Sequence, residues 1–366
     1  MVTLTRRTLL SHAAITAMTL PLMGTAHAAD LTPVKCIIPI PIFDESFAPF
    51  AVAKHMGYFK EEGLEVSFIT VRGSNEAAMQ ISTGSADVAA ASPVDEVMGL
   101  QPGKDLNTKF FYDLYYRNIW QLAVPEDSPI HGVTELKGKK LGVIGMGSGG
   151  VAFGRAYLSA AGLNPDSEIT FLAVGVGAQA IHAVQQKFVD ALAYPENLIN
   201  KLKVLGLPTR PLPVAEKLAN LPDTSLFTRR ETIRDNPKMP IGIGRAVDKG
   251  YYFNMANPAA AVKITWKLYP EAEPKNMSPD KALEGGVFVN QERMKIWKSP
   301  NTDEGKDGSF LEPQWKDFID FMLQQKLIEK PVPLDLIYTN ELIPDINKFD
   351  REKVRADAKA FDISKL

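Results

Sequence analysis

Apolar and polar positions along this chain follow two periods in turn, one typical of strands and one typical of helices. The first such segments are a short apolar run at 34–39, a helical pattern at 47–56 and a β-branched run at 64–71. A further helix, which Ser74 can cap, ends at Gly84 before a strand at 87–91. Because this β-α-β-α-β order needs right-handed crossovers, it predicts a mostly parallel sheet covered on both faces.

A second alternating unit begins after the turn residues 127–129. The expected strands cover 141–144, 169–174 and 190–193. Helices are expected from a glycine-rich turn at 145–150 through Ala161, over 178–186, and from Pro195 onward.

Beyond residue 228 the strand signals become few and long amphipathic stretches follow, at 258–269, 279–297 and 313–327. Two α/β units joined by an extended segment at 120–125 predict an α/β protein with two lobes, whose ligand lies between them at the carboxyl ends of the strands. We assign residues 29–125 and 228–366, with a helical C-terminal extension, to lobe I. Residues 126–227 form lobe II.

The N-terminal segment has the pattern of a secretory signal. Arg6-Arg7 precede an apolar stretch at 13–23 and a small-residue cleavage site at Ala26-His27-Ala28. We therefore expect residues 1–28 to be a signal peptide, of the twin-arginine type rather than an ordinary Sec signal with two arginines. The predicted location is the periplasm, without a lipid anchor, because no cysteine directly follows the cleavage site.

Composition narrows the possible functions. The 41 Lys+Arg and 43 Asp+Glu residues give a net charge of −2, which does not favour a nucleic-acid partner. Cys36 is the only cysteine, so an internal disulfide and a thiolate metal cluster are excluded, and we expect a small buried side chain in a strand. The histidines at 55, 131 and 182 are scattered singly, and no metal-ligand spacing is present.

The glycine-rich turn at 145–150 satisfies the letters of the dinucleotide fingerprint, but the strand that follows ends in Gly175-Val176-Gly177 and offers no acid for a ribose. Two interpretations remain. The helix N-terminus and the Ser148 hydroxyl can bind a small anion, or the segment is a tight strand-to-helix turn without a ligand. Ser148 does not match a hydrolase elbow, which needs a glycine two residues before the serine, where Met146 stands.

Four segments together resemble a known family. They are 53–66 (AKHMGYFKEEGLEV), 84–88 (GSADV), 127–130 (DSPI) and 136–143 (LKGKKLGV). They are similar to the nitrate, sulfonate, taurine and thiamine-pyrimidine-precursor family of type II periplasmic binding proteins, the soluble receptors of ABC importers. The resemblance covers nearly all of the chain after the signal and implies two lobes that close on a ligand by hinge motion.

Carried over by position, the resemblance implies a ligand pocket at strand ends and helix starts of both lobes. Its expected residues are Phe43, Asp44, Ser74, Asn75, Ser92, Gly147, Ser148, Gly149, Gly177, Tyr194, Glu196 and Asn197. For some of these a structural role is equally open: a cap for Ser74, a turn for Ser92 and core packing for Tyr194. Asp44 and its neighbour Glu45 would repel an anion unless they point away or meet an amine.

Two further groups of side chains bear on the ligand. Arg72 and Arg117 are candidate counter-charges. The aromatic residues Tyr112, Tyr115, Tyr116 and Trp120 either line the pocket and suit a ring with acid groups, or belong to the core.

The predicted function is that of a monomeric periplasmic solute-binding receptor of an ABC importer. Its ligand would be a small organic anion, a sulfonate or an aromatic or aliphatic carboxylate, and its partner an inner-membrane permease. The alternatives are a receptor for a thiamine-precursor pyrimidine and a periplasmic sensor lobe. An enzyme related to the thiamine-pyrimidine synthases is disfavoured, and we expect no catalytic residues, cofactor or metal.

Overall fold

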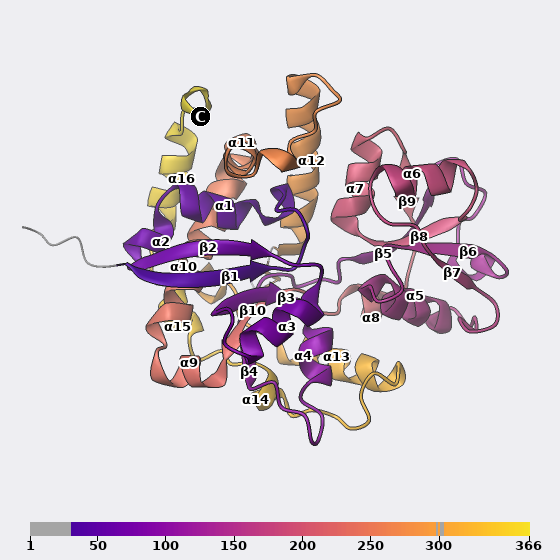
Figure 1. Ribbon diagram of the computed structural model, residues 1–366, viewed down its shortest axis with the longest axis horizontal. Helices are drawn as coiled ribbons and strands as arrows, with labels where there is room; N and C mark the ends of the chain where they lie inside the picture. Colours follow the sequence, from indigo (N-terminus) through magenta and orange to yellow (C-terminus); the bar gives the residue numbers. More distant parts are fainter. Residues whose placement is uncertain (1–30, 298, 301–303) are drawn as a thin grey trace, which may run out of the picture. The chain divides into compact units, whose positions relative to one another are not determined.

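The computed structural model describes residues 31–297, 299–300 and 304–366. The predicted signal peptide, 1–28, lies outside the described residues. Two five-stranded mixed sheets with flanking helices, together with a helical C-terminal region, form the two-lobed fold that the sequence predicts (Figure 1).

The first sheet has the strand order β2-β1-β3-β10-β4. Strand β1 (Thr32–Ile38) pairs in parallel with β2 (Leu64–Thr70) and β3 (Val88–Ala91). Strand β10 (Ser225–Arg229) is antiparallel to β3 and to β4 (Thr108–Asp113). The carboxyl ends of β1, β2 and β3 therefore meet at one edge, together with the start of β10 and the end of β4.

The second sheet repeats this topology, with the order β7-β6-β8-β5-β9. Strand β6 (Lys140–Val143) is parallel to β7 (Thr170–Ala173) and β8 (Ala191–Pro195). Strand β5 (Trp120–Pro125) runs antiparallel to β8 and β9 (Thr209–Pro211). The sequence assigned 120–125 to lobe I, but these residues are a strand of the second sheet, because their backbone pairs with β8 and β9.

Two segments, 114–119 and 212–224, therefore cross between the sheets, and they bind each other where they leave the first sheet. The Leu114 and Tyr115 amides donate to the Thr224 carbonyl at 3.2 and 3.0 Å, and the Asp223 amide donates to the Tyr115 carbonyl at 3.1 Å. This is the double connection expected of a hinge between two lobes.

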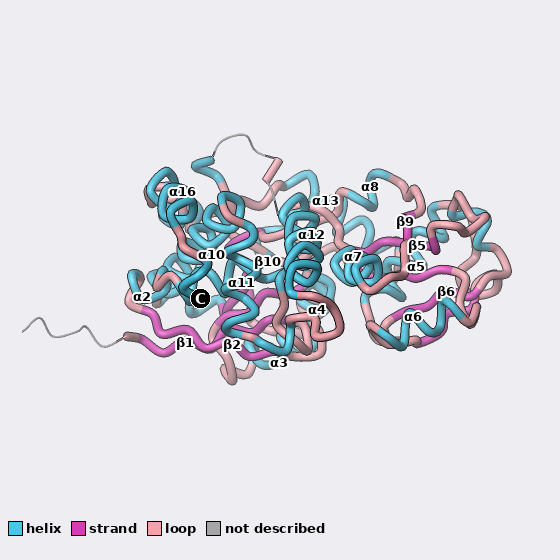
Figure 2. The backbone as a smooth tube through the Cα atoms, turned by 90° about the horizontal axis from the view of Figure 1, so that it is seen from above, coloured by secondary structure: helices cyan, strands magenta, loops and turns pink. Residues whose placement is uncertain are grey.

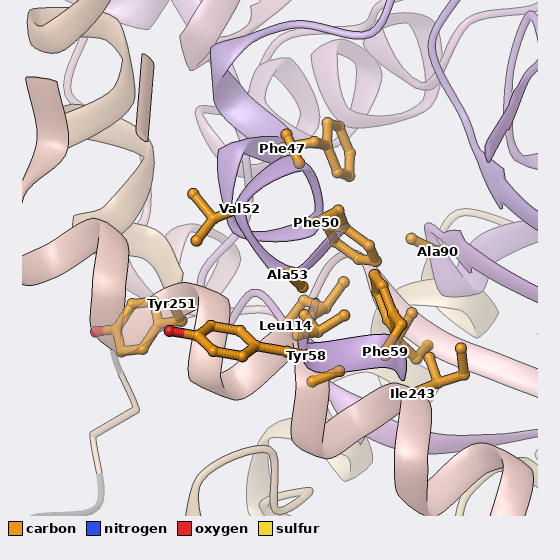
Figure 3. Close-up of a cluster of buried hydrophobic side chains, with 14 of the residues drawn as sticks. Phe47, Phe50, Val52, Ala53, Tyr58, Phe59, Ala90, Leu114, Ile243 and Tyr251 are labelled. Carbon is orange, nitrogen blue, oxygen red and sulfur yellow. The ribbon is translucent and has the colours of Figure 1, made fainter. Parts of the chain in front are cut away.

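Side chains of β1 alternate between two cores. Val34, Cys36 and Ile38 pack with α1 (Ala48–His55) and α10 (Lys238–Ala256), whereas Ile37 belongs to the core on the opposite face. In the first core, Phe50 and Phe59 lie beside Ile243 of α10 (Figure 3). Cys36 is buried, as predicted.

The helices that flank the sheets follow the predicted pattern closely. Helices α3 (Ser74–Ser82), α5 (Gly149–Ala160), α6 (Ala178–Gln185) and α7 (Glu196–Val204) each follow a parallel strand (Figure 2). The predicted amphipathic stretches form α11 (Pro258–Leu268), α12 (Pro279–Trp297) and α13 (Glu312–Gln324). The remaining α-helices are α2 (Tyr58–Glu61), α4 (Pro93–Met98), α8 (Glu216–Ala219), α9 (Arg230–Asp235), α14 (Leu334–Ile337), α15 (Ile343–Ile346) and α16 (Arg351–Ala360).

Helix α13 contributes to a core shared by both sheets. Phe321 of α13 stacks on Phe153 of α5 with ring centroids 5.0 Å apart. The Gln314 amide of the same helix donates to the carbonyls of Tyr116 and Asn220, one on each crossing segment. The C-terminal region thus packs against both lobes and is hydrogen-bonded to both crossing segments.

Candidate ligand-binding site

In the first lobe, two of the predicted site residues are joined directly. The Ser92 amide, at the end of β3, donates to the Ser74 hydroxyl at 3.0 Å. The predicted cap by Ser74 is wrong: the N-cap of α3 is Gly73, and the Ser74 hydroxyl is turned to β3 instead. Asn75 lies beside Asp95, where its hydrogen bond partly offsets the burial that raises the pKa of the Asp95 carboxyl. The carboxyl ends of β2 and β3 are therefore held together by Ser74.

In the second lobe, the carboxyl end of β6 leads through the glycine-rich turn into α5. Ser148 is the N-cap of α5, yet its hydroxyl makes no capping bond. The hydroxyl oxygen is buried and has no hydrogen-bond partner among the described residues. A buried hydroxyl without a partner is costly, so this atom is a candidate for a ligand contact. Gly147 and Gly149 flank it, and Gly177 begins α6 with a φ of 59° that favours glycine.

The Trp120 side chain, at the start of β5, lies on the same turn. A Cβ placed on Gly149 would be 2.6 Å from the Trp120 ring, so the backbone approaches the indole closely. The Trp120 ring also stacks on Phe153, with ring centroids 6.1 Å apart and planes at 13°. Gly149 is therefore needed for packing against Trp120, whether or not a ligand binds at this turn.

We expect Gly150→Ala to reduce the free energy of unfolding by about 1–3 kcal/mol, because its Cβ would lie 2.3 Å from the Ala193 carbonyl oxygen of a buried strand. Urea titration followed by circular dichroism measures the loss. Gly147→Ala, in the same turn, is the control: its Cβ meets no atom within 4 Å, and a change below about 0.5 kcal/mol is expected. Equal losses in the two variants would contradict this account.

Two predicted site residues are buried against protein. The Phe43 ring is fully buried and stacks on Tyr269, with centroids 4.1 Å apart. The Tyr194 ring is buried, and its hydroxyl donates to the Gly175 carbonyl, which ties β8 to the loop after β7. In this structure both side chains support the loops of the site.

The predicted acidic residues meet amines, and these contacts run between the lobes. The Lys201 ammonium of α7 is 2.6 Å from Asp44 and 3.5 Å from Glu45. Burial raises the pKa of the Asp44 carboxyl, but the Lys201 charge and the hydrogen bonds from Lys201 and Ser46 together outweigh it, so the net shift is downward. For Glu45, burial dominates and raises the pKa.

Glu196 and Asn197 are also engaged across the lobes. The Glu196 carboxylate accepts two hydrogen bonds from the Arg293 guanidinium of α12, one of 3.0 Å from Nη2. The Asn197 amide donates to the Ser46 hydroxyl at 3.4 Å. Neither Lys201 nor Arg293 was a predicted site residue. Arg293 lies 97 positions from Glu196, and no sequence spacing could have indicated this pair.

Of the remaining candidates, Arg72 and Arg117 are exposed and form no ion pair with any described residue. The hydroxyl-bearing aromatics Tyr112, Tyr115 and Tyr116 are buried in the core. By contrast, three apolar side chains are exposed on loops at the carboxyl ends of β1, β6 and β7: Ile42 (50%), Met146 (58%) and Val176 (43%). The loops of the site thus combine the unpartnered Ser148 hydroxyl with exposed apolar side chains.

Across the part of the chain that the structure describes, no group of three or more His, Cys, Asp or Glu side chains could hold a metal ion. Burial raises the pKa of the Cys36 thiol far above its usual range, so this side chain does not supply a reactive thiolate. No helix among the described residues has the length and apolar character needed to cross a membrane.

Solved structures place this fold in a class. The alkanesulfonate-binding protein SsuA from Xanthomonas axonopodis pv. citri, bound to MOPS, superposes with a TM-score of 0.62 at 15% identity, over 85% of this chain and 99% of SsuA. The chain therefore has the two-lobed fold of periplasmic binding proteins. The desulfurization enzyme DszB shares the fold with a TM-score of 0.55 at 14% identity, over 86% of this chain and 98% of DszB, so the fold alone does not separate receptors from enzymes.

A family model identifies this chain more specifically than its fold does. The model of the NMT1/THI5-like family matches residues 44–261, which is more than half of the chain, and this protein belongs to that family. The resemblance drawn from the sequence segments is thereby confirmed. A relative, the riboflavin-binding protein RibY of Chloroflexus aurantiacus, is 25% identical over 299 residues, covering 81% of this chain and 82% of RibY.

Proposed function

We propose that this protein is a periplasmic solute-binding receptor of an ABC importer and that it captures a small organic anion with an apolar body between its two lobes. The observation that carries the proposal is the buried Ser148 hydroxyl, which has no partner among the described residues and stands at the N-terminus of α5. Free backbone amides and the helix dipole at that end favour a negative group.

The charged side chains at the ligand edges of the two sheets support an anionic ligand. The side chains of Asp44 and Glu196, which would repel it, are paired with Lys201 and Arg293. Arg72, directly after β2, and Arg117, on a crossing segment, are exposed cations that can balance a ligand charge. We propose direct ligand contacts for Ser74, Asn75, Ser92, Gly147, Ser148, Gly149 and Gly177, with the other predicted residues supporting the loops.

The exposed apolar side chains favour a ligand that has an apolar part in addition to its charged group. Ile42, Met146 and Val176 would leave apolar surface in water around a bare nitrate, whereas an alkyl chain or an aromatic ring would cover it. Sulfonates and aromatic or aliphatic carboxylates meet both requirements.

The proposed partner is an inner-membrane permease, by analogy with relatives named as sulfonate-binding proteins and import components. Receptor function also agrees with the burial of Cys36, which removes the one thiol that an enzyme could use as a nucleophile.

The relationship to RibY favours a second ligand class, a planar heteroaromatic ring such as a flavin or a pyrimidine. The apolar loops and the Trp120 ring would suit such a ring as well. The two classes differ in charge, and a binding assay with both decides between them.

Thermal shift of residues 29–366 with alkyl sulfonates, taurine, benzoate, phthalates, nitrate, pyrimidines and riboflavin tests the proposal. At a free concentration of about 100 Kd, binding adds about 2.7 kcal/mol, a shift of a few degrees. We expect a selective shift with one organic anion and no turnover. A shift with riboflavin alone would support the second class, and consumption of a ligand would contradict the receptor function.

For a ligand found in this way, Ser148→Asp is expected to weaken binding at least about tenfold, because it sets a negative charge where the anion is proposed to bind. Isothermal titration calorimetry gives the affinity. Ser159→Asp, at an exposed position near the other end of α5, is the matched control and should bind as the wild type does. Unchanged affinity in Ser148→Asp would place the site elsewhere.

A further inference from the structure

Helix α7 belongs to the second lobe, yet its polar side chains are bound to the first lobe and to the C-terminal region. We call the five charged residues of this contact the α7 joint: Asp44, Glu45, Glu196, Lys201 and Arg293. The apolar face of α7 packs in the second lobe, where Ile199 and Leu202 are buried with Tyr194 of β8. The helix is thus shared between the two lobes.

The pair at the start of α7 is the most buried part of the joint. The Glu196 and Arg293 side chains are 4% and 2% exposed, and the guanidinium donates two hydrogen bonds to one carboxylate. The same guanidinium lies over the Tyr115 ring, with its carbon 4.5 Å from the ring centroid. Since Tyr115 is on a crossing segment and Glu196 follows β8, Arg293 contacts both the hinge and the ligand edge of lobe II.

The second ion pair lies farther along α7 and is partly open to solvent. Lys201 is 28% exposed and contacts Asp44, which is 7% exposed. At its C-terminal end, α7 is in close contact with α12. A Cβ on Gly285 of α12 would be 2.5 Å from Cγ1 of Val204. Both ends of α7 are therefore fixed to elements outside its own lobe.

Separating Glu196 from Arg293 is unfavourable, because both side chains are almost fully buried and would lose their ion pair without gaining contact with water. A movement of lobe II that pulled α7 away from α12 would separate this pair of charges, whereas a rotation of lobe II about α7 would keep the pair together. The lobes are also joined by the core around Phe153 and Phe321 and by surface contacts such as the pair of Lys217 and Asp317, with side chains 55% and 45% exposed. An exposed ion pair of this kind breaks easily.

We propose that Arg293 is a positioning residue, which fixes lobe II on lobe I through Glu196 and makes the α7 joint the pivot of lobe movement. The proposal extends the receptor function given above, but its test needs no ligand. If no compound binds, the receptor function fails, while the position of the lobes can still be measured.

The test is a distance measurement between spin labels in the two lobes. Met79→Cys on α3 and Phe188→Cys after α6 replace side chains that are 52% and 56% exposed. Cys36 is buried with a raised thiol pKa, so it does not react with the label. We expect one narrow distance distribution for the doubly labelled, otherwise unchanged protein.

Glu196→Gln with Arg293→Met removes the pair without leaving a buried charge, and the distribution is expected to become at least about twofold wider. Asp44→Asn with Lys201→Met removes the partly exposed pair without leaving the Asp44 charge buried and unpaired, and it is expected to give a smaller but resolved widening. Lys217→Met, which removes the surface pair, is the control and should leave the width unchanged. An unchanged distribution in the first two variants, or equal widening in all three, would overturn the proposal.

Discussion

Replacing Arg293 by methionine is expected to lower the free energy of unfolding by about 3–5 kcal/mol, because it leaves the Glu196 carboxylate buried without a counter-charge. The Glu196 side chain is 4% exposed, and both of its oxygens accept from Arg293. Methionine keeps the length of the apolar stem, so lost packing is a small part of the effect. Guanidinium chloride titration measures the change.

The double variant Glu196→Gln/Arg293→Met separates the charge from the packing. It contains no unpaired ion, so we expect it to recover at least about 1–2 kcal/mol of the loss. Arg293→Lys keeps the charge but loses the two-pronged hydrogen bond, and its stability should lie between those of the wild type and Arg293→Met. A double variant less stable than Arg293→Met would show that the charge is not the cause.

The fold was predictable because strand and helix periods are local. The β-branched run at 64–71 corresponds to β2, Leu64–Thr70, and the amphipathic stretch at 258–269 to α11, Pro258–Leu268. Helix α10, Lys238–Ala256, is not apparent from the pattern, because Gly242, Gly244 and Gly250 weaken the helical signal. In the structure Gly250 allows close packing: a Cβ there would be 2.0 Å from the Pro49 carbonyl oxygen.

The candidate site was predictable only in part. Parallel strands place their carboxyl ends at one edge, so Ser74 and Ser92 could be expected together, and they share a hydrogen bond. The amines that meet the acidic residues could not be predicted. Asp44 and Lys201 are 157 positions apart, and their pairing depends on how α7 packs against the first lobe.

The other large effect concerns pH and a second buried acid, Glu96 of α4. Its side chain is almost fully buried; one oxygen accepts from the Thr108 hydroxyl, and the other has no partner among the described residues. Burial raises the pKa of this carboxyl from 4.5 to about 8, against the Thr108 hydrogen bond, with a further upward contribution from Asp95. The folded protein therefore holds a proton at neutral pH that the unfolded chain releases.

This bound proton determines whether stability rises or falls with pH. Between pH 4.5 and 8 the folded state binds more protons than the unfolded state at this group, so its contribution to stability is present at low pH and is lost as the pH rises. Between pH 5 and pH 9 we expect the wild type to lose about 4 kcal/mol relative to Glu96→Gln, in which a neutral amide can still accept from Thr108.

Urea titrations of both proteins at several pH values measure this difference, and other titrating groups cancel in the comparison. Glu284→Gln, at an exposed position of α12, is the control and should follow the wild type at every pH. A constant difference between wild type and Glu96→Gln would mean that Glu96 is ionised in the folded state. Helix α4 begins at the proposed ligand edge, next to Ser92, so an ionised Glu96 would add a negative charge there. With this proton bound, the Glu96 carboxyl is neutral at the edge of lobe I, while Asp44 and Glu196 are paired with Lys201 and Arg293.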